Sequence, residues 1–573
     1  MNKTGIIVFV CFLVLFTSCI SASGTFYKGS SRINEADLIE NKSRFEMLSY
    51  NGDTLYVGGS GPDNYSRIQD AINAANEGDT IFVYDDSSPY VENLYVDKRL
   101  NIVGENPATT IIDGSFGLMC ATLVADGIQF SGFTCMKHLG VGIGTNSNNN
   151  VITKNIIRGW VFHRDIGILL EGASNNTVSN NWIYAIYNSG IELDLGSNNN
   201  TVVNNTVFKC RLSGIWLNEG SSNNKISYNT FDDNGNGIFI TEDCRNNEIS
   251  FNHMIDNWRS GIKLLRSCND NTINQNLIMN NERDGINLTN IDFYPSIQNK
   301  IYLNTLKENI LSAFDDQEPN IWYNTSLQRG NYWDDYLDFY PPLDEEPPFG
   351  VWDIPYNISG GNNQDRYPLV NSPLCDYINV TYVEAIDQEI EFFGSAYGGI
   401  PPYSWKWDFS DGHYSEEQNP THSFDEPGLY HVELEVTDSE SNTSIHTIQL
   451  RILIDNEKPK IYIEKPYHSL YILNQLAYPF WINTPFTGLV ILLNFSVVIG
   501  SLDIEVDVKD NITTIDRVEV YINDKLEYES TESTFSYNWK RGKILKARES
   551  ITIVAYDAAG NRASKTHTVW RFL

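Results

Sequence analysis

A repeat of 23 to 28 residues is the feature that most constrains the fold of this chain. An asparagine that usually closes an Asn-Asn pair recurs at Asn150, Asn176, Asn200, Asn224, Asn247, Asn271 and Asn299. A Gly-Ile pair keeps the same phase, at Gly142, Gly167, Gly190, Gly214, Gly237, Gly261 and Gly285. Two independent markers in phase predict a solenoid in which each repeat forms one coil.

The residue types within each repeat indicate which solenoid this is. Short runs with period-2 alternation, such as Ile226-Ser227-Tyr228 and Ile238-Phe239-Ile240, are bounded by Asn, Asp and Gly. Leucine-rich repeats of similar length carry a leucine pattern and usually a helix, whereas β-branched residues and Asn dominate here. We therefore predict an all-β fold whose main part is a right-handed parallel β-helix.

An asparagine ladder is expected inside this β-helix. Stacked coils lie about 4.8 Å apart, so that side-chain amides at one position of each coil can hydrogen-bond up and down the stack. The alternative is that these asparagines are turn residues that tolerate a left-handed backbone, but this explains single asparagines and not their fixed phase. The predicted inward ladder consists of Asn155, Asn181, Asn205, Asn229, Asn252 and Asn276.

Charge and length limit the classes of partner. The chain has 573 residues, enough for three or four domains, and a formal net charge of −33. Phosphate backbones and anionic lipid surfaces would repel such a chain. Nucleic acid is therefore excluded as an expected partner.

The N-terminus resembles an export signal. Lys3 precedes an apolar run from Gly5 to Phe16 and a group of small residues. We predict a signal peptide over residues 1–23 and a flexible lead-in over 24–52, which implies a secreted or cell-surface protein. A lipoprotein-type signal, with lipid on Cys19, is the alternative. No transmembrane segment is predicted, because the apolar run at 486–500 is too short and is interrupted.

Two cysteines occupy the same position of the repeat. Cys244 and Cys268 are 24 residues apart, so they should be stacked one coil apart. Their expected spacing lies inside the disulfide range, but parallel side chains would strain the bond. Both a disulfide and a stack of free thiols stay open. The chain has no Cys-x-x-Cys, which excludes a zinc knuckle or a redox motif of that kind.

A short amphipathic helix should cover the first coil. Ser66-Arg67-Ile68-Gln69 has the spacing of a capping box, and the pattern continues through Ala75 and stops at Gly78. The segment IQDAINAANEGDTIFV that begins at Ile68 is similar to the entry of pectin-lyase-like β-helix proteins. The coils resemble the NosD-type family and the carbohydrate-binding and sugar-hydrolysis domains. GNYWDDY, at 330–336, resembles the tail that closes such helices. We place the β-helix domain at 53–375.

The family resemblance also bears on metals. Its tail usually carries an Asp- and Gly-rich run suited to calcium, but this chain has Asp344, Glu345 and Glu346 without the glycines. The NosD-type resemblance implies copper delivery, and copper sites favour clustered His, Met or Cys. His253-Met254 is the one adjacent pair of this kind, and a surface histidine is the alternative. We therefore predict no metal ligands and no cofactor, with calcium and copper as the alternatives.

Two smaller domains are expected after the β-helix. The region 376–455, with Trp407-Asp408-Phe409 and Pro427-Gly428-Leu429-Tyr430, resembles a PKD domain, an immunoglobulin-like β-sandwich. Val432, Leu434 and Val436 should point together into its core. The region 456–573 has alternating strands and an Asn523-Asp524 turn, which predict a second immunoglobulin-like sandwich. It resembles modules that end many archaeal cell-surface proteins.

Outward side chains in a β-helix form columns across coils, so a site is sought there. Two residues after the Gly of each marker, the column contains Leu169, Glu192, Trp216, Phe239, Lys263 and Asn287. Four residues after it, the column contains Glu171, Asp194, Asn218, Thr241, Leu265 and Thr289. The repeat therefore predicts an acidic cluster beside two aromatic rings.

This cluster suggests a sugar site. A pyranose stacks its C–H face on aromatic rings, so Glu192, Asp194, Trp216 and Phe239 are the predicted ligand-binding residues. Glu171, Glu192 and Asp194 are candidate catalytic carboxylates, because glycoside hydrolysis needs two such groups. The alternative is that these acids only solvate the surface. A cationic group on later coils, Arg259, Lys263, Arg266 and Arg283, would contact an anionic sugar or balance Glu282 and Asp284.

The sequence favours a secreted or cell-surface protein, of archaeal type, that binds polysaccharide or glycan or mediates adhesion at the envelope without catalysis. Other surface proteins are expected as further partners. A polysaccharide hydrolase or lyase on the same face is the first alternative. Copper delivery is the second, and it rests on family analogy alone.

Overall fold

The computed structural model describes residues 52–573, apart from 116, 160–164, 291–292, 341–349, 381–382, 387, 454–457, 467–468, 473–474, 480, 484–489, 493–495, 500, 511–514, 540–547, 558–560 and 573. The described chain is almost entirely β-structure, which confirms the predicted fold class. The predicted signal peptide, Cys19 and the acidic run at 344–346 lie outside the described residues.

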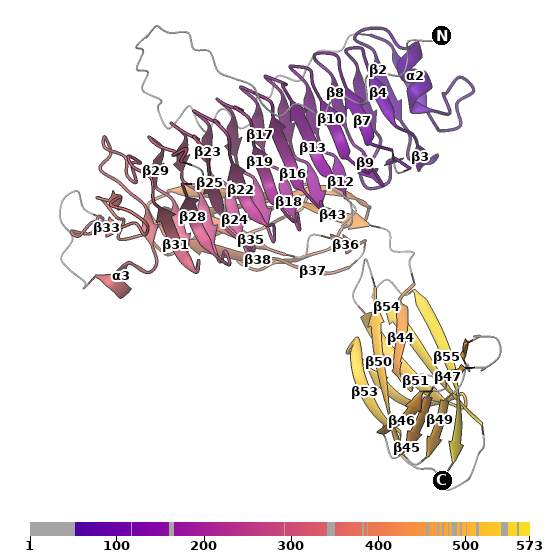
Figure 1. Cartoon of the computed structure of the whole chain (residues 1–573). Coiled ribbons are helices and arrows are strands. Elements are labelled where there is room, and N and C mark those ends of the chain that lie inside the picture. The colour runs from indigo at the N-terminus through magenta and orange to yellow at the C-terminus, as the bar shows by residue number, and fades with distance from the viewer. Residues whose placement is uncertain are drawn as a thin grey trace. The chain divides into compact units, whose positions relative to one another are not determined.

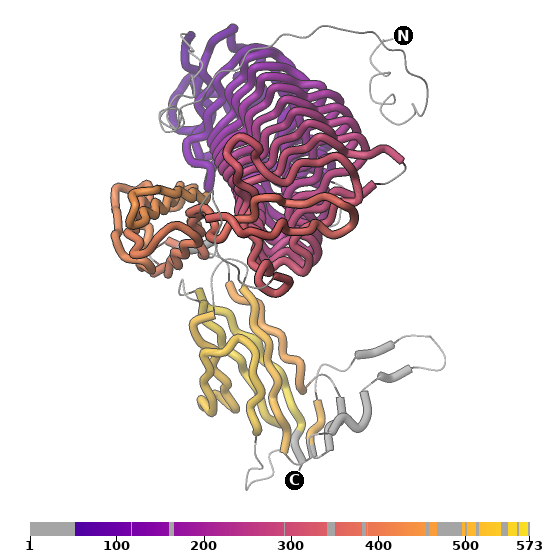
Figure 2. The backbone as a smooth tube through the Cα atoms, turned by 90° about the vertical axis from the view of Figure 1, so that its left-hand side faces the viewer, coloured from indigo at the N-terminus to yellow at the C-terminus, as the bar shows by residue number. Residues whose placement is uncertain are grey.

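Three long parallel sheets form the β-helix, and each coil contributes one strand to each sheet (Figure 1). Figure 2 shows the successive coils stacked as near-parallel tubes, coloured from indigo to pink. Sheet A has 11 strands: β1 (Thr54–Val57), β2 (Thr80–Val83), β5 (Asn101–Gly104), β8 (Gln129–Ser131), β11 (Val151–Thr153), β14 (Thr177–Ser179), β17 (Thr201–Val203), β20 (Lys225–Ser227), β23 (Glu248–Ser250), β26 (Thr272–Asn274) and β29 (Lys300–Tyr302).

Sheet B also has 11 strands: β3 (Tyr90–Val91), β6 (Ile111–Asp113), β9 (Thr134–Met136), β12 (Ile156–Arg158), β15 (Trp182–Tyr184), β18 (Thr206–Phe208), β21 (Thr230–Asp232), β24 (His253–Ile255), β27 (Leu277–Met279), β30 (Thr305–Lys307) and β32 (Tyr332–Trp333). Sheet C has 10 strands: β4 (Leu94–Val96), β7 (Met119–Leu123), β10 (Val141–Thr145), β13 (Ile166–Glu171), β16 (Ser189–Asp194), β19 (Ser213–Leu217), β22 (Asn236–Ile240), β25 (Ile262–Leu264), β28 (Asp284–Leu288) and β31 (Leu311–Asp315).

The Gly-Ile marker builds the inner wall of sheet C. The isoleucine of every marker is fully buried and stacks on its equivalents: Ile143, Ile168, Ile191, Ile215, Ile238, Ile262 and Ile286. The glycine is required by close approach. A Cβ added to Gly214 would lie 2.4 Å from the ring of Phe231 and 2.8 Å from the carbonyl oxygen of Gly237. A larger residue would therefore push the coils apart.

The asparagine that closes each pair and the predicted inward asparagines form two separate buried ladders. Each backbone N–H in the predicted set, from Asn155 to Asn276, donates to the side-chain oxygen of its equivalent on the next coil at 2.9 to 3.1 Å. The marker asparagines from Asn150 to Asn299 do the same at 2.8 to 3.0 Å. A third ladder, at Asn234, Asn257, Asn281 and Asn309, was not predicted.

The left-handed backbone belongs to the first residue of the Asn-Asn pair. Asn175, Asn199 and Asn223 have φ of 60°, 57° and 58°, whereas their neighbours Asn176 and Asn200 belong to the ladder. Asparagine tolerates this conformation better than most residues. The pair therefore serves two needs, because its first member turns the chain and its second satisfies buried polar groups of the adjacent coils.

The helix α2 (Ile68–Ala74) covers the N-terminal end of the stack, with Ile68, Ala71 and Ile72 in the core. The predicted capping box does not form, because no side chain of the N-cap residue Arg67 bonds to the helix. The carboxylate of Glu92, from the next coil, accepts instead from the backbone N–H groups of Ile68 and Gln69 at 2.8 and 3.0 Å. A negative charge at a helix N-terminus is favourable because the first backbone N–H groups there have no partner within the helix. In α2 a residue distant in sequence, Glu92, supplies this charge.

Aromatic residues close the other end of the β-helix, near α3 (Tyr336–Phe339). Trp322 and Trp333 are buried in the main core. The Asp365 carboxylate, on the hairpin of β33 (Tyr356–Asn357) and β34 (Gln364–Asp365), accepts from the indole N–H of Trp333 at 2.9 Å and from the backbone N–H of Asn331 at 2.6 Å. Burial raises the pKa of Asp365 to about 7, although these hydrogen bonds lower it.

The next domain is a β-sandwich. Its five-stranded sheet contains β36 (Val383–Ala385), β43 (Thr443–Leu453), β42 (Gly428–Thr437), β39 (Ser404–Asp408) and β40 (Tyr414–Ser415). Two pairs complete it: β35 (Cys375–Asn379) with β38 (Phe393–Tyr397), and β37 (Ile390–Glu391) with β41 (Thr421–His422). Val432, Leu434 and Val436 share its core with Trp407, as the alternation in the sequence predicts.

This sandwich covers part of the outer face of sheet B. Leu429 packs on Ile156, Trp182 and Phe208. The His446 ring accepts from the backbone N–H of Ile378 at 3.0 Å, so its other nitrogen donates to the hydroxyl of Thr230 at 2.8 Å. The hydroxyl of Thr206 accepts from the backbone N–H of Gln449 at 3.0 Å. Buried polar pairs of this kind make the contact specific.

The C-terminal domain is a second sandwich with its own core around Ile504, Val520 and Ile553. Its strands are β44 (Lys460–Lys465), β50 (Leu502–Lys509) and β53 (Thr534–Trp539) in one sheet, β46 (Gln475–Pro479), β45 (Ser469–Ile472), β49 (Ser496–Ile499), β55 (Arg562–Phe572), β54 (Glu549–Asp557), β51 (Ile515–Ile522) and β52 (Lys525–Ser530) in another, and the pair β47 (Trp481–Asn483) and β48 (Val490–Leu492). The predicted turn at Asn523-Asp524 joins β51 to β52 with φ of 50° and 64°.

Candidate functional site

The outer face of sheet C brings the predicted site residues together. Strand register pairs Glu192 with Trp216, Trp216 with Phe239, and Phe239 with Lys263 on successive coils. Glu171 pairs with Asp194 one column further along the same strands. We call Glu192, Asp194, Trp216 and Phe239 the acid–aromatic strip. Strands β13, β16, β19 and β22 carry these columns and lie side by side in Figure 1.

Glu192 is the most perturbed acid of the strip. Glu192 is only 5% exposed, and its Oε2 atom has no hydrogen-bond partner among the described residues. Burial raises the pKa of Glu192 to about 8, and the negative charges of Asp194 and Glu171 raise it further. A carboxyl with this pKa is protonated at neutral pH, so it can both donate and accept a hydrogen bond.

Asp194 has a different environment. Its Oδ1 atom accepts from the backbone N–H of Leu195 at 2.9 Å and from the side-chain amide of Asn218 at 3.1 Å. Asn218, on the next coil, is itself buried, and its Oδ1 atom lacks a hydrogen-bond partner within the described part of the chain. The strip therefore combines a buried carboxyl with a half-buried, hydrogen-bonded one.

Trp216 and Phe239 form the aromatic part of the strip. Their rings are stacked, with centroids 5.7 Å apart and planes inclined by 20°, and both residues are half-buried. The indole nitrogen Nε1 of Trp216 is buried without a hydrogen-bond partner in the described structure. Buried indole N–H groups usually find an acceptor, and each unpaired one costs about 1 to 3 kcal/mol. The half-buried rings give the strip apolar contact groups, and the half-buried carboxylate of Asp194 gives it a polar one.

The column becomes basic beyond the rings. Burial lowers the pKa of Lys263, and the charges of Arg283 and Arg259 lower it further, while Asp284 opposes them. These cations therefore lie close enough to interact. Arg266 does not belong to this group, because it forms an ion pair with Glu242 on the previous coil at 2.7 Å.

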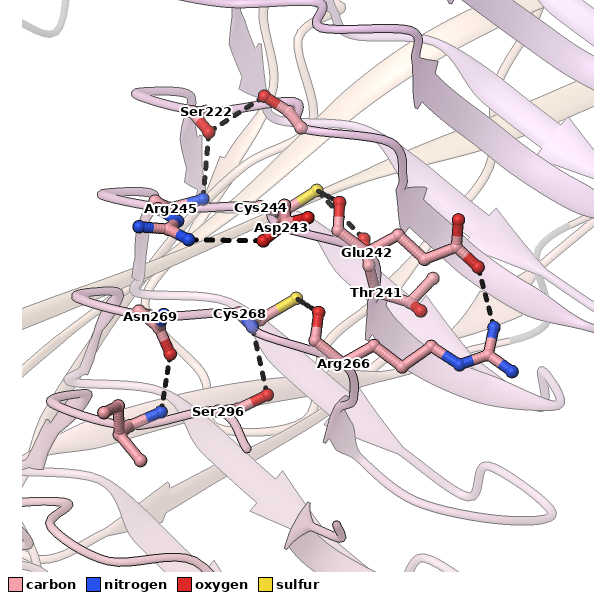
Figure 3. Close-up of polar contacts among 12 residues, drawn as sticks. Ser222, Thr241, Glu242, Asp243, Cys244, Arg245, Arg266, Cys268, Asn269 and Ser296 are labelled. Atoms are coloured by element: carbon pink, nitrogen blue, oxygen red, sulfur yellow. Dashed lines mark hydrogen bonds and ion pairs between the residues drawn. The ribbon is translucent and has the colours of Figure 1, made fainter. Parts of the chain in front are cut away.

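The two stacked cysteines lie at the turn that follows sheet C (Figure 3). Both are buried and free, so the structure contains thiols and no disulfide between them. The thiol of Cys244 donates to the carbonyl oxygen of Thr241 at 3.1 Å, and that of Cys268 to the carbonyl oxygen of Leu265 at 3.0 Å. Burial raises the pKa of Cys244, so it is a structural thiol rather than a reactive one.

The histidine considered for copper is not on the surface. His253 is buried beneath the second domain, and its ring lies 3.9 Å from that of His446. Burial lowers the pKa of His253 to about 3, so it is neutral. The sequence could not show this, because the covering residues Tyr377 and His446 lie 124 and 193 positions away.

One further group of metal-ligating side chains was not predicted. Asp411, His413 and His422 lie together in the second domain, with one ligand atom of each within 4.8 Å of the others. The nearest sequence signal is Asp411-Gly412-His413, whereas His422 lies on β41, which pairs with β37.

Among the residues that the structure describes, no helix has the length and hydrophobicity needed to cross a membrane.

Comparison with known proteins finds three families along the chain. The family described as a right handed beta helix region matches residues 16–231, 120–278 and 211–310, which together cover just over half of the chain. A PKD domain matches 371–452, and a bacterial Ig domain matches 493–569. These matches identify the three kinds of domain, but they do not test the NosD type or the archaeal origin expected from the resemblance.

Curated relatives share only a short segment. The chain is 33% identical over 98 residues to Collagenase ColA of Bacillus cereus, which is 16% of this chain and 10% of that protein. It is 30% identical over 96 residues to Collagenase ColA of Clostridium perfringens, which is 16% of this chain and 8% of that protein. The chain thus spans about a tenth of the length of these relatives.

Solved structures resemble single parts of the chain. The A-module of the mannuronan C-5 epimerase AlgE6 of Azotobacter vinelandii is 15% identical, with a TM-score of 0.33, over 45% of this chain and 92% of that one. The PKD1 domain of the Vibrio cholerae metalloprotease PrtV is 25% identical, with a TM-score of 0.13, over 14% of this chain and 95% of that one. With the family matches and the three stacked sheets together, the chain belongs to the right-handed β-helix family and carries a PKD domain and a bacterial Ig domain after the helix.

Proposed function

We propose that this protein acts outside the cytoplasm, at the cell surface, and binds polysaccharide on the acid–aromatic strip without catalysing a reaction. The observation that carries the proposal is the pairing of Glu192 with Trp216 beside the stacked ring of Phe239. The signal-like N-terminus and the two sandwich domains support the location. The sandwiches serve as spacers or adhesive modules.

The chemistry of the strip suits a sugar. Pyranose rings place their C–H faces on aromatic rings, and Trp216 and Phe239 offer two adjacent faces. Sugar hydroxyls both donate and accept, so they can pair with the half-buried carboxylate of Asp194 beside the rings.

The basic end of the column extends this surface. Lys263 follows Phe239 in register, and Arg259 and Arg283 interact with it. A polysaccharide that carries carboxylate or sulfate groups would gain from these charges if its chain runs along the column. Neutral chains would use the rings and Asp194 alone. Comparing neutral with acidic polysaccharides therefore tests which part of the column is used.

A hydrolase or lyase is the second candidate, and the pKa of Glu192 favours it. A general acid must hold its proton at neutral pH, and Glu192 does so while the environment of Asp194 is polar. Glycoside hydrolysis requires two carboxyl groups in such different environments. Against catalysis, Glu192 is 5% exposed, which leaves a scissile bond little access to its oxygens.

A glycan array with the purified full-length chain tests the proposal. We expect binding to one or more polysaccharides by the unmodified protein and by Tyr95→Ala, and clearly weaker binding to the same polysaccharides by Trp216→Ala. Tyr95 is the matched control, because it is an exposed aromatic on the same outward column but far from the strip. Equal binding by Trp216→Ala and Tyr95→Ala would contradict the proposed site.

Incubation of the same polysaccharides with the protein separates binding from catalysis. Release of reducing ends or unsaturated products, lost in Glu192→Gln, would replace the binding proposal with the enzymatic one. We expect no such release. Glu192→Gln keeps the size and the hydrogen-bonding groups of the side chain, so it should leave binding largely intact.

A further inference from the structure

The second domain carries a cluster of histidines and an aspartate that the polysaccharide proposal does not use. Asp411 and His413 lie in the turn between β39 and β40, and His422 ends β41. The Oδ2 atom of Asp411 is 2.6 Å from Nε2 of His422. Its Oδ1 atom is 3.3 Å from Nδ1 of His413. One carboxylate is therefore shared by two imidazoles that approach it from different sides.

Packing holds two of these side chains in place. The ring of His422 is stacked on Phe409, with centroids 4.2 Å apart and planes inclined by 17°, and the edge of Phe424 contacts it at 4.7 Å. Phe409 and Phe424 belong to the core of the domain. The imidazole is thus fixed with Nε2 directed at Asp411, and its side chain is only 13% exposed.

The carboxylate is held in one position. The Oδ1 atom of Asp411 accepts from the backbone N–H of His413 at 2.9 Å, which orients the group. The two imidazole contacts and this backbone contact together fix the position of the carboxylate in the turn.

Further negative charge surrounds the cluster. Burial raises the pKa of Tyr430, and the negative charges of Asp411, Glu426 and Asp425 raise it further. The neighbourhood is therefore acidic on the side of the β41–β42 turn. A cation would be attracted to this end of the domain, and a second anion would be repelled.

We propose that Asp411, His413 and His422 bind one divalent transition-metal ion, with Zn²⁺ as the ion that best fits them. Two imidazole nitrogens and one carboxylate oxygen are ligands that zinc accepts, whereas calcium and magnesium prefer oxygen alone. The three ligands leave a coordination position open. The side chain of His413 is 70% exposed, so this open position faces solvent.

The distances need only small changes. Tetrahedral Zn²⁺, with bonds of about 2.0 to 2.2 Å, places its ligand atoms about 3.3 Å from one another. The His413 nitrogen has this separation from Oδ1 of Asp411, and the His422 nitrogen lies 2.6 Å from Oδ2, so a zinc ion between the imidazoles would contact both carboxylate oxygens or require the carboxylate to turn. The ligand atoms lie within 4.8 Å of one another, and the exposed His413 side chain can rotate to bring its nitrogen closer.

The competing explanation is that His422 and Asp411 form only a structural hydrogen bond and that His413 is a surface residue. The two explanations differ in the role of His413. A structural pair does not need it, whereas a metal site loses one of three ligands when it is removed. His413→Ala is therefore the informative variant, because its exposed side chain can be removed without disturbing the core.

The experiment uses the full-length chain, stripped with a chelator and dialysed against Zn²⁺. We expect one Zn²⁺ per chain by elemental analysis, and in His413→Ala an affinity at least about tenfold lower, a loss seen even for residues that only support metal ligands. Tyr414→Ala is the matched control, since it removes the exposed neighbouring side chain and should bind as the unmodified protein does. Asp411→Asn should lose affinity as well.

Cobalt provides a second measurement that does not depend on stability. Co²⁺ bound by these ligands should give a visible absorption spectrum of tetrahedral or five-coordinate type, and this spectrum should be absent in His413→Ala. Zinc uptake that is nil in the unmodified protein, or the same in His413→Ala as in Tyr414→Ala, would overturn the proposal.

Discussion

Glu192 and Trp216 are register partners on adjacent coils, and each carries a buried polar atom without a hydrogen-bond partner in the described structure. The atoms are Oε2 of the carboxyl group and Nε1 of the indole. Stacked β-helix coils normally satisfy their buried polar groups, as the asparagine ladders do. This departure lies beside the half-buried, stacked rings of Trp216 and Phe239, which is why we place the ligand there.

Loss of the proton from buried Glu192 should make the β-helix less stable as the pH rises. The pKa of Glu192 is about 8 in the folded protein and near 4.5 when unfolded, so the folded state binds the extra proton between these values. Stability from this group is complete below about pH 4.5 and lost as the pH passes 8. Between pH 5 and pH 8, the melting temperature of Glu192→Gln should fall less than the melting temperature of the unmodified protein. An equal loss in both proteins would exclude this assignment.

The buried histidine pair should produce the opposite dependence. Burial lowers the pKa of His253 to about 3, and that of His446 well below its usual value, so the unfolded chain binds protons more readily below about pH 6.5. Their contribution to stability is therefore lost as the pH falls from 6.5 toward 3. His253→Leu removes the ring that faces His446 and Tyr377. We expect a weaker acid sensitivity of the melting temperature in this variant, and an unchanged one would contradict the pairing.

The two members of an Asn-Asn pair should respond differently to substitution. Asn224→Ala removes the amide that accepts from Asn200 and donates to Ser197 and Asn247, so we expect a loss in the free energy of unfolding of roughly 3 kcal/mol. Asn223→Gly is the control, because glycine adopts its φ of 58° without strain and the change should cost less than about 1 kcal/mol. Urea unfolding measures both, and equal losses would refute the division of roles.

The buried carboxylate of Asp365 should be needed to close the β-helix. Asp365→Ala leaves the indole N–H of Trp333 and the backbone N–H of Asn331 unpaired, at a cost of about 1 to 3 kcal/mol for each group. Asp365→Asn keeps an acceptor and should lose less. Limited proteolysis should cut the C-terminal end of the β-helix faster in Asp365→Ala than in Asp365→Asn. Similar cleavage of the two variants would show that the carboxylate is not critical there.

Much of the β-helix could be predicted because its repeat is local. The Gly-Ile marker assigns each outward residue to a column, so the alignment of Glu192, Trp216, Phe239 and Lys263 follows from counting. Hydrogen bonds within one ladder follow the same count. The burial of Glu192 does not, because it depends on the size and packing of neighbouring side chains.

Features that depend on distant segments could not be predicted. Glu92 caps α2 from the next coil, and Glu242 pairs with Arg266 across coils instead of leaving it free for a ligand. The sandwich residues that cover His253, Tyr377 and His446, come 124 and 193 positions later in the chain. His422 likewise meets Asp411 only in the folded domain, because it lies 11 positions later, on strand β41, with no regular ligand spacing to mark it.

The most direct test of the account is titration calorimetry with a polysaccharide that the array identifies. Replacing one stacking ring should weaken binding by about 1 kcal/mol or somewhat more, close to tenfold in the dissociation constant. We predict this loss for Trp216→Ala and Phe239→Ala and an unchanged constant for Tyr95→Ala. Unchanged binding in all three variants would contradict the central claim that the strip on sheet C is the binding site.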